Sequence, residues 1–227
     1  MVNNEERKIK AVLFDMDGLM FDTERLYMDA WKKTGEKLGI PIGDEFLLQS
    51  RGMVRGDSSK LFTKLYDPSM DYEEIIAVRQ EFFNKELEKG IVCKKGLKEL
   101  LVYLKRHGYK TALATSTPKE RALKLVRETG TEYFLDEFAF GDSVEKGKPE
   151  PDIFLKAAEF VHVSPEFCLV LEDSKNGLIA GKRAGCKVIM IPDLVPETEE
   201  LKKVIDAKLD DLEQVIGWLQ KVNGETK

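Results

Sequence analysis

Short apolar runs recur along the chain, and the first of them is followed at once by acidic residues. The stretch Ile9–Phe14 is mostly apolar, which predicts a short strand buried on both faces of a sheet. Gly18 favours a sharp turn soon afterwards, so Asp15 and Asp17 are expected at the carboxyl end of this strand. Open α/β sheets keep their binding sites at that edge.

The chain that follows, from about Asp22 to Val92, has helical patterns and no strand-like run. The clearest helix is predicted within Asp71–Gly90, where apolar residues recur three and four positions apart. Asp71 and Glu74 have the spacing of a capping box, which marks the start of this helix. We therefore expect an all-helical segment of roughly 70 residues.

Beyond Gly96, helical and strand-like patterns alternate to the end of the chain, beginning with a helix from Leu97 and a strand over Tyr109–Thr115. Repeated crossover units of this kind build a parallel sheet. The predicted fold is therefore α/β. A Rossmann-like catalytic core, residues 1–21 and 94–227, carries an inserted helical cap domain, residues 22–93. The short junctions between them are expected to act as hinges, so that the cap opens and closes.

Composition and charge exclude several classes of protein. The 227 residues are 42% hydrophobic and 34% charged, as in a globular protein. The 36 lysines and arginines against 41 acidic residues give a net charge of −5 without a broad basic cluster, so no nucleic-acid partner is expected. The first ten residues lack the apolar core of a signal peptide, and no run is long enough to span a bilayer. We expect a cytoplasmic monomer without a membrane partner.

Hydroxyl side chains follow the predicted strand Tyr109–Thr115. Thr115 and Ser116 stand at its carboxyl end, and Thr117 with Glu120 has the spacing of a capping box for the next helix. Free backbone N–H groups at a helix start bind anions. Capping explains Thr117 and Glu120 without any further role, so we take only Thr115 and Ser116 as candidate phosphate-binding residues.

A second acidic pair follows another apolar run, because Glu172 and Asp173 come directly after Leu169–Leu171. If that strand neighbours the first, these carboxylates crowd Asp15 and Asp17, and like charges so close require a counter-ion or a shared proton. The two histidines stand apart, so a zinc site has no ligands. Mg²⁺ is the expected cofactor, since it prefers oxygen ligands and bridges carboxylates to phosphates.

These residues support transfer of a phosphoryl group. Asp15 is expected to attack phosphorus and form an aspartyl-phosphate, a known covalent intermediate. Asp17, kept partly protonated by its neighbours, is expected to protonate the leaving oxygen and then to activate water. With Asp15, Glu172 and Asp173 ionised, Mg²⁺ and Lys148 together balance the negative charge. A phosphomonoester could then approach the cluster.

Four segments, in order, resemble the motifs of the haloacid dehalogenase superfamily, in its phosphatase and phosphomutase branch with a helical cap: DMDGLMFDTE, ATST, GKPEPDIF and EDSKNG. The resemblance covers residues 10–192, nearly the whole chain, and places the backbone carbonyl of Asp17 on the metal. The site residues that it implies are Asp15 as nucleophile, Asp17 as acid and base, Thr115 and Lys148 on the phosphate, and Asp15, Glu172 and Asp173 on magnesium.

Within that superfamily the chain resembles β-phosphoglucomutase and pseudouridine-5′-phosphatase. Arg55 and Ser58 stand where the mutase holds the distal phosphate of its substrate. Tyr27 replaces a mutase histidine that helps the phosphoenzyme to wait for a sugar rather than water. We therefore expect a phosphatase, with a mutase as the alternative, and take Tyr27, Arg55 and Ser58 as substrate-binding candidates. Trp31 is expected in the core of the cap.

Three other classes share part of this pattern. A receiver-type signalling domain also arranges strand-end aspartates, a hydroxyl and a lysine around Mg²⁺, but it has no cap and needs no acid at Asp17. A dehalogenase needs neither a metal nor Asp17. A catalytically silent binding protein would not require the complete set of acids. The substrate stays open among hexose phosphates, pentose phosphates and nucleotides.

Overall fold

The computed structural model describes residues 8–50, 55–194 and 196–224, without the side chains of Arg55 and Asp57. Within these ranges a single sheet of six parallel strands has the order β3-β2-β1-β4-β5-β6. The α/β prediction is confirmed. The strands are β1 (Ala11–Phe14), β2 (Lys110–Thr115), β3 (Glu137–Phe140), β4 (Cys168–Glu172), β5 (Lys187–Met190) and β6 (Ala207–Lys208).

The chain divides into two compact units, which we call the core unit (Met1–Phe21 with Cys93–Lys227) and the helical unit (Asp22–Val92). The two segments that lead out of the core unit pair with each other through an antiparallel bridge between Phe21 and Cys93. The helices of the helical unit are α1 (Thr23–Leu38), α2 (Asp44–Gln49), α3 (Arg55–Leu65) and α4 (Tyr72–Leu87). Those of the core unit are α5 (Leu97–Arg106), α6 (Lys119–Glu128), α7 (Asp152–Phe160), α8 (Lys175–Arg183), α9 (Glu199–Lys202) and α10 (Gln214–Asn223).

Strand β1 lies at the centre of the sheet, and its four residues are all fully buried. Phe14 is in register with Leu113 of β2 on one side and with Leu171 of β4 on the other. From β1 the chain adds β2 and β3 on one side and β4, β5 and β6 on the other, so the strand order reverses there. Such a switch point opens a crevice at the carboxyl ends of the strands.

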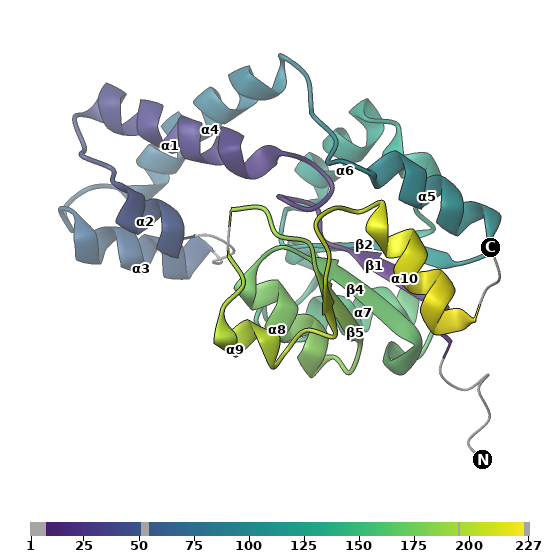
Figure 1. Ribbon diagram of the computed structural model, residues 1–227. Coiled ribbons are helices and arrows are strands. Elements are labelled where there is room, and N and C mark those ends of the chain that lie inside the picture. The colour runs from purple at the N-terminus through teal and green to yellow at the C-terminus, as the bar shows by residue number, and fades with distance from the viewer. Residues whose placement is uncertain (1–7, 51–54, 195, 225–227) are drawn as a thin grey trace. The chain divides into compact units, whose positions relative to one another are not determined.

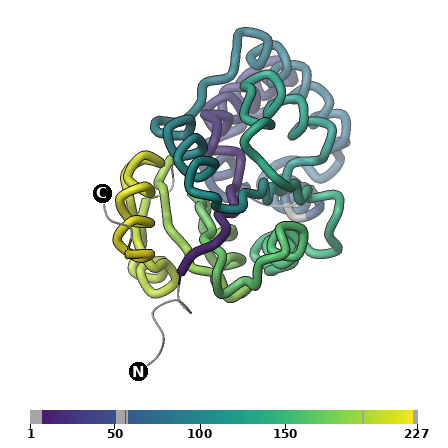
Figure 2. Tube along the Cα trace, turned by 90° about the vertical axis from the view of Figure 1, so that its right-hand side faces the viewer, coloured from purple at the N-terminus to yellow at the C-terminus, as the bar shows by residue number. Residues whose placement is uncertain are grey.

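Both faces of the sheet are covered by helices, which explains the continuous apolar runs in the strands. Phe154 of α7 and Leu178 of α8 join Leu13 of β1 in one buried cluster. Figure 1 shows α5 and α10 on the opposite side of the sheet from α7 and α8. In Figure 2 the yellow turns of α10 and the green turns of α7 again lie on opposite sides of the purple β1.

The helical unit has an aromatic core of its own. Trp31 of α1 is buried and meets Phe46 of α2 edge to face, with ring centroids 4.9 Å apart. This confirms the expectation for Trp31. Helix α4 begins where the sequence predicts, and the Asp71 carboxylate accepts a hydrogen bond from the Glu73 amide at 2.9 Å. Of the helices in the described ranges, none combines the length and apolar character needed to cross a bilayer.

Candidate active site

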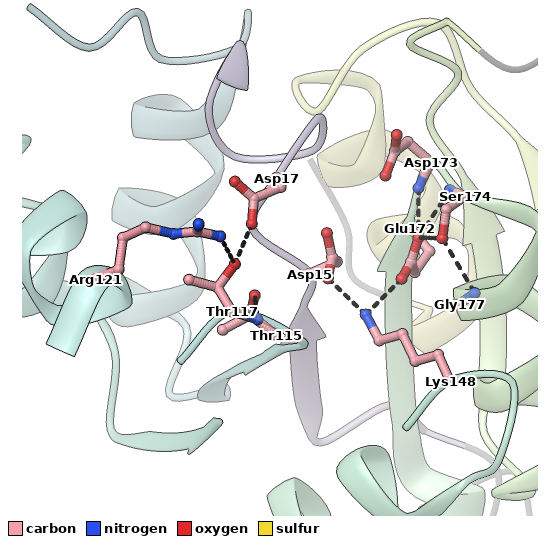
Figure 3. Close-up of polar contacts among 10 residues, drawn as sticks. All are labelled: Asp15, Asp17, Thr115, Thr117, Arg121, Lys148, Glu172, Asp173, Ser174 and Gly177. Carbon is pink, nitrogen blue, oxygen red and sulfur yellow. Dashed lines mark hydrogen bonds and ion pairs between the residues drawn. The ribbon is translucent and has the colours of Figure 1, made fainter. Parts of the chain in front are cut away.

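Asp15, Lys148, Glu172 and Asp173 meet in the core unit, at the carboxyl ends of β1 and β4 (Figure 3). The backbone amide of Asp15 donates to the Leu171 carbonyl at 3.1 Å, which extends the strand pairing by one residue. Lys148 Nζ donates to Asp15 Oδ1 at 2.5 Å and to Glu172 Oε1 at 2.6 Å. One carboxylate oxygen each of Asp15, Glu172 and Asp173 lies within 4.8 Å of the other two. The structure thus brings these four predicted residues together.

The start of α8 holds the Glu172 carboxylate in place. Its Oε2 accepts from the backbone amides of Asp173 and Ser174, at 2.9 and 2.8 Å, and from the Ser174 hydroxyl at 2.9 Å. The Ser174 hydroxyl also caps α8 by accepting from the Gly177 amide at 3.1 Å. A Cβ atom at Gly177 would overlap the Glu172 carboxylate. Gly177 therefore allows the close approach of α8 to this acid.

Burial and charge decide the ionisation of the cluster. Burial raises the pKa of Asp15 from its ordinary value of 3.8 to about 8, against the opposing attraction of the Lys148 ammonium group. Burial also disfavours the charge on Lys148, but Asp15 and Glu172 outweigh this effect, so the pKa of Lys148 lies above its usual value. The Lys148 ammonium group pairs with Asp15 and Glu172, and the buried Asp173 carboxylate lies beside them. A hard divalent cation fits their all-oxygen donor set.

The hydroxyls after β2 form a second group of polar contacts. Thr117 Oγ1 donates to Asp17 Oδ2 at 2.5 Å and accepts from Arg121 Nη2 at 2.8 Å. The Thr117 amide donates to Thr115 Oγ1 at 3.1 Å, and Thr115 is buried whereas Ser116 is exposed. Figure 3 shows Asp17 on the side of Thr117 and Arg121, while Asp15 faces Lys148.

The capping box predicted at Thr117 is wrong. Helix α6 begins at Lys119, its N-cap is Pro118, and no side chain caps it. The N-cap and the helix start thus lie one residue later than predicted, and the Thr117 hydroxyl is bonded to Asp17 instead. The contact of Thr117 with Arg121 is not predicted from the sequence, and the spacing of four residues between them is the local signal that could have indicated it.

The substrate-binding candidates of the helical unit stay predictions. The Tyr27 ring contacts the Phe83 ring, with centroids 4.2 Å apart and the ring planes tilted by 30°. The Ser58 hydroxyl is buried and lies 2.6 Å from the Tyr72 hydroxyl. The side chain of Arg55 lies outside the described residues.

The model of the haloacid dehalogenase-like hydrolase family matches residues 9–185 of the chain. The chain belongs to this family. The matched range includes both strand ends and both groups of polar contacts described above. The resemblance inferred from the four motifs is thereby confirmed, as is the prediction of an enzyme.

The relatives of this haloacid dehalogenase-like hydrolase include a phosphatase and a mutase. It is 34% identical to phosphorylated carbohydrates phosphatase from Thermotoga maritima, over 80% of this chain and 84% of the relative. It is 33% identical to β-phosphoglucomutase from Bacillus subtilis, over 78% of this chain and 80% of the relative.

A solved structure shares the fold and a similar level of identity. CbbY from Rhodobacter sphaeroides, a variant crystallised with xylulose-1,5-bisphosphate, matches 91% of this chain and 96% of its own length. The TM-score is 0.77 and the sequence identity 30%.

Proposed function

We propose that this hydrolase is a Mg²⁺-dependent phosphatase that cleaves a small phosphomonoester through an aspartyl-phosphate at Asp15. The observation that carries the proposal is that Lys148 bonds both Asp15 and Glu172, beside Asp173, at the switch point of the sheet. The hydrogen bond from the buried Lys148 holds the Asp15 carboxylate in one orientation, as a nucleophile requires. The Thermotoga relative named for phosphorylated carbohydrates supports a phosphorylated small metabolite as substrate.

The donor set of the buried acids supports magnesium as the cofactor. Asp15, Glu172 and Asp173 would hold it, and the family resemblance adds the backbone carbonyl of Asp17. The ion, when bound, would neutralise these carboxylates and stabilise the charge on the phosphoryl oxygens. Lys148 supplies the remaining positive charge. Together they let a phosphate dianion approach an otherwise negative cluster.

The residues divide the reaction into two displacements. Asp15 attacks phosphorus as the bond to the leaving oxygen breaks, and Asp17 gives its proton to that oxygen. Asp17, now a carboxylate, takes a proton from water as the water oxygen attacks phosphorus. The bond from phosphorus to Asp15 then breaks, which regenerates both aspartates and releases inorganic phosphate. We expect the Thr115 hydroxyl and Lys148 to hold the phosphoryl oxygens, with Ser116 as a further donor.

A phosphate-release screen tests the proposal. Small phosphomonoesters, including hexose phosphates, pentose phosphates and nucleotides, are incubated with the enzyme and Mg²⁺ or with a chelator. We expect Mg²⁺-dependent release of inorganic phosphate from at least one class and none with the chelator. A rate that the chelator leaves unchanged would rule out the metal, and no release from any compound would overturn the phosphatase proposal.

Asp173→Asn should weaken magnesium binding by about 10- to 100-fold while the maximal rate partly recovers at high Mg²⁺, since one anionic ligand becomes neutral. Titration of activity against Mg²⁺ measures this shift. The matched control is Asp211→Asn, because Asp211 forms an ion pair with Lys95 on the surface of the core unit. An unchanged Mg²⁺ dependence in Asp173→Asn would remove this residue from the metal site.

A phosphosugar mutase is the second candidate, supported by the Bacillus subtilis relative. A mutase must protect its aspartyl-phosphate from water until a sugar arrives, and Tyr27 stands where the mutase has its histidine. With β-glucose 1-phosphate and Mg²⁺, we expect release of inorganic phosphate without glucose 6-phosphate. Both products are followed in one reaction. Efficient isomerisation with little free phosphate would establish the mutase instead.

A further inference from the structure

The side chain of Asp17 is held by a hydroxyl that the proposed reaction does not use. Thr117 is 4% exposed, and its Oγ1 lies 2.5 Å from Asp17 Oδ2. The contact joins the loop after β1 to the loop after β2, a sequence separation of 100 residues. All of these residues belong to the core unit. The position of the Asp17 carboxyl is therefore determined partly by a neighbouring strand end.

Arg121 fixes the direction of this hydrogen bond. A guanidinium group only donates, so Thr117 Oγ1 uses a lone pair for Arg121 Nη2 at 2.8 Å. The hydroxyl proton is left for Asp17 Oδ2. The Thr117 backbone is held as well, because its amide donates to Thr115 Oγ1 at 3.1 Å. The hydroxyl is thus oriented from both sides.

We propose that Thr117, oriented by Arg121, is a positioning residue for Asp17, and the inference rests on the proposed function. Since Oδ2 accepts the Thr117 hydroxyl, the proton that Asp17 transfers is carried on Oδ1. Fixing Oδ2 also restricts the two side-chain torsions of Asp17. Proton transfer requires the acid within hydrogen-bond reach of the leaving oxygen, and small displacements from that geometry are costly.

The test compares two substrates that differ in their need for an acid. 4-Nitrophenyl phosphate releases a weakly basic phenolate, whereas β-glycerol phosphate releases an alkoxide that must be protonated. Thr117→Val keeps the shape and removes the hydroxyl. We expect kcat/KM to fall about 10- to 30-fold for β-glycerol phosphate and less than about 3-fold for 4-nitrophenyl phosphate. Thr117→Ser should restore both values, and Arg121→Met should repeat the selective loss more weakly.

The control variants change a hydroxyl and a cationic side chain at other positions in or next to α6. Thr129→Val removes a hydroxyl that donates to the Leu125 carbonyl at the end of α6, and Lys124→Met removes a surface charge of α6. Neither should alter the ratio of the two kcat/KM values. Equal losses for both substrates in Thr117→Val, or no loss, would overturn the positioning role.

Crystal structures of the wild type and Thr117→Val separate this inference from the proposed function. We expect the Asp17 carboxyl to move by about 1 Å or more in the variant, a displacement large enough to impair catalysis. An unmoved carboxyl overturns the inference whatever the activity. A wild-type enzyme that hydrolyses neither ester overturns the proposed function instead, and the two structures still decide whether Thr117 positions Asp17.

Discussion

Asp15→Asn is expected to abolish phosphate release, with a loss on the order of 10⁵-fold or more, as when other covalent nucleophiles are removed. The amide keeps the shape of the carboxyl but cannot form an aspartyl-phosphate. Phosphate release and the mass of the protein after incubation with substrate measure the effect. The wild type should gain the mass of a phosphoryl group transiently and the variant should not. Turnover close to that of the wild type would contradict the covalent scheme.

The same variant should be the more stable protein at alkaline pH when a chelator is present. Burial raises the pKa of Asp15 from 3.8 to about 8, so the folded state binds this proton more tightly than the unfolded state. The stability that the bound proton contributes is complete below the unfolded pKa and is lost as the pH rises through the folded value. The asparagine side chain does not titrate, so the Asp15→Asn variant does not lose this stability as the pH rises.

Urea unfolding between pH 4 and pH 9 tests this expectation. The stability of Asp15→Asn relative to the wild type should increase across the range from 3.8 to about 8. A pH-independent difference between the two proteins would show that Asp15 titrates normally in the folded state. The experiment also reports whether the variant folds, which the activity measurement requires.

The sheet could be predicted because its central strands β1 and β4 are buried throughout. The runs around Ile9–Phe14 and Leu169–Leu171 are apolar without alternation, and acidic residues end them abruptly. Which strands are neighbours could not be read from such local patterns. The acid cluster is therefore expected only if the two strands are adjacent. The register of Phe14 with Leu171 meets that condition.

The contacts of Thr117 with Asp17 and Arg121 were not predicted, because a local sequence pattern already explains Thr117. Thr117 and Glu120 have the spacing of a capping box, and this pattern accounts for both residues without any long-range partner. The contact with Asp17 spans 100 residues, so it depends on the placement of β2 beside β1. Pro118 is the residue that could have indicated this contact. It is itself the N-cap of α6 in the structure, so Thr117 does not cap the helix.

Gly177→Ala is expected to lower kcat/KM by at least about 100-fold, although the substitution adds a single methyl group. Glu172 cannot move aside cheaply, because four hydrogen bonds hold its carboxylate. The methyl group overlaps that carboxylate, so it must displace Glu172 or the first turn of α8. Either movement disturbs the contact with Lys148 and the predicted metal ligands, and small displacements of such groups are costly.

Gly217→Ala in α10 is the matched control for this prediction. Gly217 is an exposed helical residue, and an added Cβ meets no atom within 4 Å. That variant should be more stable by about 0.5–1 kcal/mol, through the higher helix propensity of alanine, with activity unchanged. Steady-state kinetics, Mg²⁺ titration and urea unfolding of both variants separate loss of the site from loss of the fold. Wild-type kinetics and Mg²⁺ dependence in Gly177→Ala would mean that neither Glu172 nor the start of α8 needs its observed position for activity.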